Sequence, residues 1–171
     1  MSIIFRYLNQ HDSKVRLILF CLSVLPCINL YLDYYLDDLG INPFASLIER
    51  SGFWGVFFLL VTLSITPLRR WFTWISTALK LGYGKRLSDW NYLIKSRRML
   101  GLWCLYYVSI HMFIYLHFEL DWGLEDFWLD ITERYFIAFG LLSWIILVVL
   151  GVTSPDRIRR AMGKRWRQLH R

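Results

Sequence analysis

The sequence predicts an all-α integral membrane protein, a helical bundle with four spanning segments. Hydrophobic residues make up 56% of the 171 residues and aromatic residues 18%, which is a larger apolar share than a soluble domain of this size usually has. Long apolar runs alternate with polar segments along the chain. The basic residues are concentrated in some of those polar segments and nearly absent from the others.

Four apolar runs are long enough to cross a bilayer core of ~30 Å as helices. They are residues 15–36, 52–68, 100–120 and 135–152. These runs leave no room for a separate soluble domain, so residues 1–171 are predicted to form a single transmembrane domain. The first run is predicted to stay in the protein as a helix, because no small-x-small cleavage site follows it.

The basic residues predict the orientation. Eighteen of the 20 lysines and arginines lie in the first sixteen residues, in the connection 69–98 or in the tail after residue 154. The other two connections hold one arginine each, Arg50 and Arg134, and most of the acidic residues. The positive-inside rule then places both termini and the middle connection in the cytoplasm. A nucleic-acid partner is excluded, since it would require a basic face on a soluble domain.

The middle connection, residues 69–99, is predicted to be a cytoplasmic loop that begins with an interfacial helix. Its first part has polar residues on one helical face and large apolar residues on the remainder, which is typical of a helix lying in a membrane interface. Pro67 precedes it, in the last turn of the second run, where a proline can end or bend a helix. Gly82 and Gly84 are expected to end the interfacial helix.

His111 is the strongest candidate for a functional residue, because an ionisable side chain inside a membrane span is costly and marks a functional site by default. Imidazole is a common axial ligand of haem iron. A hydrogen bond from one helix to another is an equally good explanation of His111 on composition alone.

Arg97 lies fourteen residues before His111. That separation corresponds to ~1400° of helix, close to four full turns, and to ~21 Å along the axis. Both side chains are therefore expected on nearly the same face, with the histidine deep in the membrane and the arginine at its rim. Such a face suits a haem whose iron is bound by the imidazole and whose propionates lie near the cation.

Four short stretches carry a resemblance to a known family. They are ITPLR at 65–69, RRMLGLWC at 97–104, His111 itself, and GKRWRQLH at 163–170. The chain closely resembles, from about its first span to its last residue, the haem-binding membrane subunits of the bacterial periplasmic methionine-sulfoxide reductase system (the YedZ/MsrQ type). These subunits belong to the ferric-reductase-like transmembrane superfamily.

The resemblance implies a six-helix protein of the bacterial inner membrane that binds haem b and is associated with FMN. It would receive electrons from quinol or a cytoplasmic flavin reductase and deliver them to a periplasmic molybdopterin-containing catalytic subunit, its partner besides membrane lipid. That partner reduces methionine sulfoxide, so the membrane subunit is an electron-transfer component and is assigned no catalytic residue.

On the same resemblance, His111 is the haem ligand of the third helix and His170 is the first of two histidines at the start of the fifth. Arg97 takes the place opposite His170, and Arg97 and Arg98 would pair with haem propionates or a flavin phosphate.

The sequence departs from the family after His170, because the second fifth-helix histidine would lie about thirteen residues further on. The resemblance therefore predicts that the helical bundle is incomplete at its C-terminal end, with the fifth and sixth helices missing. The alternative is a truncated, non-catalytic membrane scaffold without cofactor, in which His111 only packs.

Overall fold

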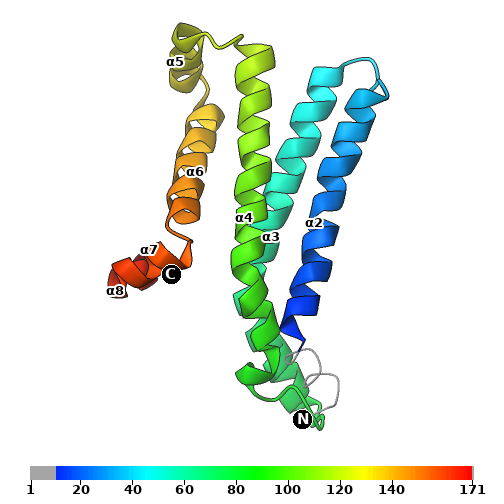
Figure 1. The fold of residues 1–171 in the computed structure, drawn as a ribbon, viewed down its shortest axis with the longest axis vertical. Helices are drawn as coiled ribbons and strands as arrows, with labels where there is room; N and C mark the ends of the chain where they lie inside the picture. Colours follow the sequence, from blue (N-terminus) through cyan, green and yellow to red (C-terminus); the bar gives the residue numbers. More distant parts are fainter. Residues whose placement is uncertain (1–10, 171) are drawn as a thin grey trace. The chain divides into compact units, whose positions relative to one another are not determined.

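The computed structural model describes residues 11–170, and every regular element in that range is a helix. The elements are α2 (Asp12–Tyr35), α3 (Pro43–Ala78), the 3₁₀ turn η1 (Leu87–Trp90), α4 (Asn91–Ile114), the π-helical turn η2 (Tyr115–Glu119), α5 (Leu124–Glu133), α6 (Tyr135–Val152), α7 (Asp156–Met162) and α8 (Lys164–Leu169) (Figure 1). The all-α prediction is confirmed for this part of the chain.

Within residues 11–170, four segments are long and apolar enough to cross a membrane: Ser13–Tyr35, Pro43–Ala78, Leu87–Glu119 and Tyr135–Val152. Each segment contains one of the four predicted runs, except that the first segment lacks residue 36 and the third lacks residue 120. The fourth segment has the same bounds as its predicted run. In the most apolar 18-residue stretch of each segment, at most 22% of the residues are buried within the protein. The other apolar side chains in these stretches are partly or fully exposed, which suits contact with lipid. The side of the membrane on which the termini lie stays a prediction, and Arg6 and Arg171 lie outside the described residues.

Pro67 does not end its helix. The 36 residues of α3 run unbroken through it to Ala78, so the segment expected to start a separate interfacial helix continues the second span instead. A proline costs the helix one backbone hydrogen bond, which leaves the other turns intact. At ~1.5 Å per residue α3 is ~54 Å long, so it either tilts strongly or extends beyond a hydrocarbon core of ~30 Å. Whether residues 69–78 lie in the interface stays a prediction.

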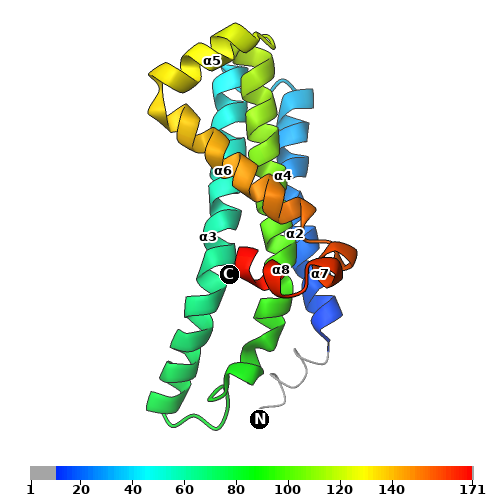
Figure 2. The ribbon, with the colours of Figure 1, turned by 90° about the vertical axis from the view of Figure 1, so that its left-hand side faces the viewer.

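The chain divides into two compact units, each of which is described by itself. The first unit comprises Met1–Asp38 and Val56–Trp103, and α2 lies beside the first half of α4 in it (Figures 1 and 2). The rings of Phe20 and Trp103 join these two helices, with their centroids 5.3 Å apart. Among the described residues of this unit, the buried apolar side chains are those of Phe58, Ile65 and Leu100.

Residues 79–90, which connect α3 to α4 in the first unit, fold back on the two helices. Arg69 of α3 donates from Nη2 to the carbonyl oxygen of Leu87 at 2.6 Å and to Oδ1 of Asn91 at 3.0 Å. The indole of Trp90 lies 4.8 Å from the ring of Phe72 and donates to the carbonyl oxygen of Gly84 at 3.1 Å. The second half of the connection is therefore held by specific side-chain hydrogen bonds.

The second unit comprises Leu39–Gly55 and Cys104–Arg171. In it the start of α3 and the end of α4 pack around the buried side chains of Leu47, Cys104 and Tyr107. Helix α6 lies against α4 (Figure 2), and its Trp144 donates from Nε1 to Oγ of Ser109 at 3.1 Å.

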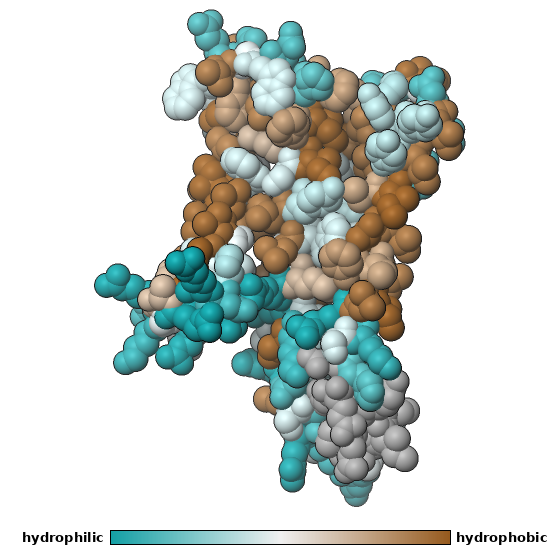
Figure 3. Space-filling view, viewed as in Figure 1, coloured by the Kyte–Doolittle hydropathy of each residue, from teal (hydrophilic) through white to brown (hydrophobic). Residues whose placement is uncertain are grey.

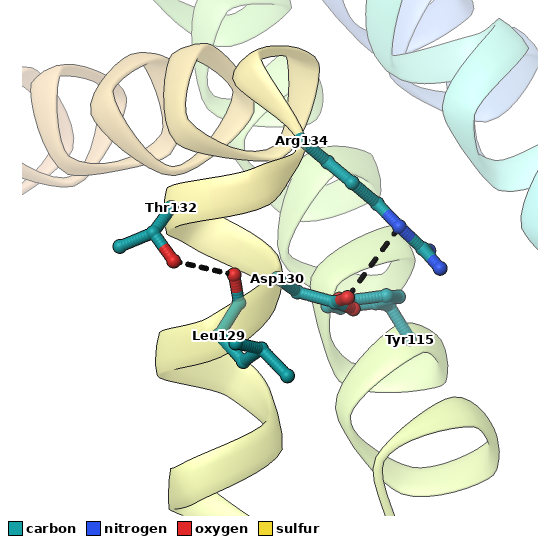
Figure 4. A network of polar contacts seen from close by, with 5 residues as sticks. All are labelled: Tyr115, Leu129, Asp130, Thr132 and Arg134. Carbon is teal, nitrogen blue, oxygen red and sulfur yellow. Dashed lines mark hydrogen bonds and ion pairs between the residues drawn. The ribbon is translucent and has the colours of Figure 1, made fainter.

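A polar network links η2 to α5 in the second unit (Figure 4). The hydroxyl of Tyr115 donates to a carboxylate oxygen of Asp130, and the other oxygen of Asp130 lies 3.5 Å from Nε of Arg134. The network joins the end of the third span to the helix that leads into the fourth.

We expect the substitution Tyr115→Phe to lower the free energy of unfolding by about 2 kcal/mol, since a hydrogen bond to a charged group contributes roughly that much. Chemical unfolding in detergent, followed by tryptophan fluorescence, measures it. Tyr135→Phe is the matched control, because the Tyr135 side chain is 77% exposed. Equal stability of the two variants would show that the Tyr115 bond does not stabilise the unit.

Candidate functional site

The imidazole of His111 lies against the first turns of α3, near the end of α4. Its Nδ1 is 2.9 Å from the carbonyl oxygen of Ile48 and 3.4 Å from Oγ of Ser51. Ser51 is fully buried, and its hydroxyl donates to the same Ile48 carbonyl oxygen at 3.1 Å. One backbone oxygen of α3 thus accepts hydrogen bonds from two side chains.

The hydrogen bond to Ile48 determines the tautomer of His111. A carbonyl oxygen can only accept, so Nδ1 must carry the proton. In the neutral imidazole the lone pair is then on Nε2, which takes part in no hydrogen bond within the described part of the chain. Histidines that bind metals usually have this arrangement, with one ring nitrogen donating to a carbonyl group and the other binding the metal.

A glycine makes room for the ring. A Cβ atom built on Gly52 would lie 3.0 Å from both Cε1 and Nδ1 of His111, closer than side chains normally approach. One turn further along α3, a Cβ on Gly55 would lie 2.8 Å from Cγ2 of Val108. The two glycines allow α3 and α4 to pack closely here, and this packing brings the imidazole to the Ile48 carbonyl group.

His170 lies at the end of α8, in the same unit as His111, and is held to the end of α6. Its Nε2 is 2.8 Å from the hydroxyl oxygen of Thr153. Its ring stacks on Trp166 with centroids 4.3 Å apart, and Trp166 donates from Nε1 to the Thr153 carbonyl oxygen at 2.9 Å. In this arrangement His170 uses Nε2 for Thr153, so binding a metal through Nε2 would require the ring to leave Thr153.

Arg97 and Arg98 lie in the first unit, in the second turn of α4. Arg97 is partly buried and Arg98 is exposed. Their predicted pairing with a cofactor stays a prediction. Two of the four predicted site residues, His111 and His170, have rings that hydrogen bonds hold in a defined orientation.

The residues that orient the two rings were not predicted from the sequence. They are Ile48, Ser51, Gly52, Thr153 and Trp166. A backbone carbonyl group such as that of Ile48 leaves no trace in a sequence. The two glycines three residues apart, Gly52 and Gly55, are a usable signal, since small residues at helical spacing indicate close helix packing.

Comparison with known proteins identifies the family. Residues 51–171 match the model of the ferric reductase like transmembrane component. The chain belongs to this family. This segment, most of the chain, includes His111, His170 and both arginines. No solved structure was found to match the chain.

Curated relatives are similar over nearly the whole chain. Proteins named "Protein-methionine-sulfoxide reductase heme-binding subunit MsrQ" are 35% identical over 93% of the chain in Herminiimonas arsenicoxydans, 33% over 93% in Azospira oryzae and 34% over 96% in Rhodospirillum rubrum. The chain spans 66%, 62% and 72% of the lengths of these three relatives. The resemblance found in the sequence motifs is thereby confirmed, and the family and the four candidate spans together make this a multi-pass membrane protein.

Proposed function

We propose that this ferric reductase-like chain is a haem b-containing electron-transfer subunit of a bacterial inner membrane, in which Nε2 of His111 would bind the haem iron. The hydrogen bond of 2.9 Å between Nδ1 of His111 and the Ile48 carbonyl oxygen carries the proposal. It fixes both the tautomer and the direction of the ring. The relatives bear the name of a heme-binding subunit, which supports haem as the group that this imidazole binds.

The protein's part in this function is to hold and orient a ligand nitrogen in an apolar setting. The Ile48 carbonyl group keeps the proton on Nδ1 and increases the basicity of the imidazole. Gly52 sets the distance of the ring from α3, and the apolar spans exclude water. A haem bound there would supply one-electron chemistry, with a potential set by its ligands and its burial.

His170 is the proposed second haem-linked histidine, and the Thr153 hydroxyl competes for its Nε2. Arg97 and Arg98 are proposed partners of propionates. FMN rests on the family resemblance alone, and its test is flavin fluorescence of the purified, denatured protein. The proposed electron acceptor is a periplasmic molybdopterin-containing methionine-sulfoxide reductase, and the proposed donor is quinol or a cytoplasmic flavin reductase.

A second candidate function, a membrane scaffold without cofactor, is favoured by one observation. The bond between His111 and Ile48 is also the helix-to-helix hydrogen bond that a purely structural histidine would make. This explanation accounts for Nδ1 and assigns no role to Nε2.

The test is a reduced-minus-oxidised absorption spectrum of the chain purified from bacterial membranes in mild detergent. We expect the α band of a b-type haem, and its reduction by a soluble quinol analogue. Reoxidation by methionine sulfoxide should then require the added catalytic subunit. Folded protein without a haem band would favour the scaffold. A haem that no quinol or flavin reductase reduces would contradict the proposed donors.

A further inference from the structure

The first unit has a second candidate site, an open pocket of about 500 Å³ between α2 and the start of α4. Three of its lining residues are cationic: Arg16 on α2, and Lys95 and Arg98 on α4. Arg97, the neighbour of Arg98, is not among the described residues that line the pocket. The pocket contains none of the residues that contact the rings of His111 and His170, and it shares only Arg98 with the proposed haem partners.

The other side of the pocket is apolar and open. Leu17, Phe20 and Leu102 line it, with 63%, 47% and 41% of their surfaces exposed. All three belong to the candidate membrane spans. Hydrophobic side chains continue from here along α2 (Figure 3). The pocket thus combines a cationic end with an apolar wall that extends along a lipid-facing helix.

We propose that this pocket binds an anionic phospholipid, with the phosphate between Arg16, Lys95 and Arg98 and an acyl chain along Leu17, Phe20 and Leu102. Basic pockets between membrane helices bind such head groups. Arginine and lysine both bind phosphate, the first through a planar fork of donors and the second as a point charge. A soluble anion would use the cations but would leave the apolar wall uncovered, so both parts of the pocket together fit a lipid.

The test is native mass spectrometry of the purified chain in a neutral detergent, titrated with phosphatidylglycerol or with phosphatidylcholine of the same acyl chains. We expect phosphatidylglycerol to be retained preferentially. The double variant Arg16→Gln/Lys95→Gln should bind phosphatidylglycerol more weakly, by about fivefold for each cation removed. This is the effect that one basic residue has near an anionic membrane surface. Both residues are exposed, and neither is a proposed haem partner.

Two controls make the result specific. Arg160→Gln/Lys164→Gln removes two exposed cations from α7 and α8 in the other unit and should leave retention unchanged. Arg16→Lys/Lys95→Arg keeps both charges and should retain the lipid, which separates loss of charge from a folding defect.

Three outcomes would overturn the proposal. The first is equal retention of the two lipids by the unmodified chain. The second is an equal loss in the two charge-removing variants, which would indicate diffuse attraction. The third is displacement of phosphatidylglycerol by millimolar inorganic phosphate, which would identify a site for soluble anions. None of these outcomes depends on whether the chain binds haem.

Discussion

Replacing His111 by alanine is expected to abolish the α band of a b-type haem in the reduced-minus-oxidised spectrum. The substitution removes Nε2, the proposed ligand atom, together with the Nδ1 bond to the Ile48 carbonyl oxygen. Loss of that one hydrogen bond should cost only about 1 kcal/mol of stability. The variant should therefore reach the membrane and elute from a sizing column as the unmodified chain does.

His117→Ala is the matched control. His117 is exposed, and its Nδ1 accepts a hydrogen bond from Nε1 of Trp122 at 3.2 Å, so its substitution should leave the band in place. His111→Gly in the presence of imidazole gives a positive test, because a free imidazole bound in the vacated space can act as the ligand. A full haem band in His111→Ala would contradict the assignment of this residue as a ligand.

The elements most accurately predicted from the sequence were those governed by hydropathy. The fourth span, Tyr135–Val152, was located to the residue, because a lipid-facing helix needs an apolar side chain at almost every position. Of the two outcomes considered for Pro67, an end or a bend of the helix, the end does not occur, since a proline removes one backbone hydrogen bond without stopping a helix that is apolar on both sides. Helix α5 was not predicted. Its ten residues lie in the acidic connection before the fourth span, and that connection was used only to predict the orientation in the membrane.

The candidate site could be predicted only in part. His111 is recognisable, because an ionisable residue stands out in an apolar run. Its partner on α3 is a backbone oxygen more than sixty residues away, and no sequence pattern distinguishes one carbonyl group from another. The same holds for His170, whose contact with Thr153 depends on the turn at Gly163. That residue has a φ of +54° between α7 and α8, a value that glycine adopts readily.

The substitution Gly52→Ala is expected to weaken haem binding by at least about tenfold, the usual effect of disturbing the groups that orient a metal ligand. The added methyl group would lie 3.0 Å from Cε1 and Nδ1 of His111, so the ring must shift by a few tenths of an ångström, which should disturb its hydrogen bond to the Ile48 carbonyl oxygen. A glycine-to-alanine change within a helix otherwise favours that helix by roughly 1 kcal/mol. Weaker haem binding in a chain of equal or greater stability would therefore result from the displaced ring.

Two other glycines separate this effect from general changes in packing. Gly140→Ala on α6 should leave the haem content unchanged and raise the stability by roughly 1 kcal/mol, because the new methyl group would point into open space. In Gly55→Ala the new methyl group would lie 2.8 Å from Cγ2 of Val108. This variant tests the packing of α3 on α4 without a contact to the imidazole of His111. We expect haem titration to rank the affinities as Gly140→Ala, Gly55→Ala and Gly52→Ala, from strongest to weakest. If Gly52→Ala bound haem as tightly as Gly140→Ala, the contact between His111 and α3 would not be what positions the ligand.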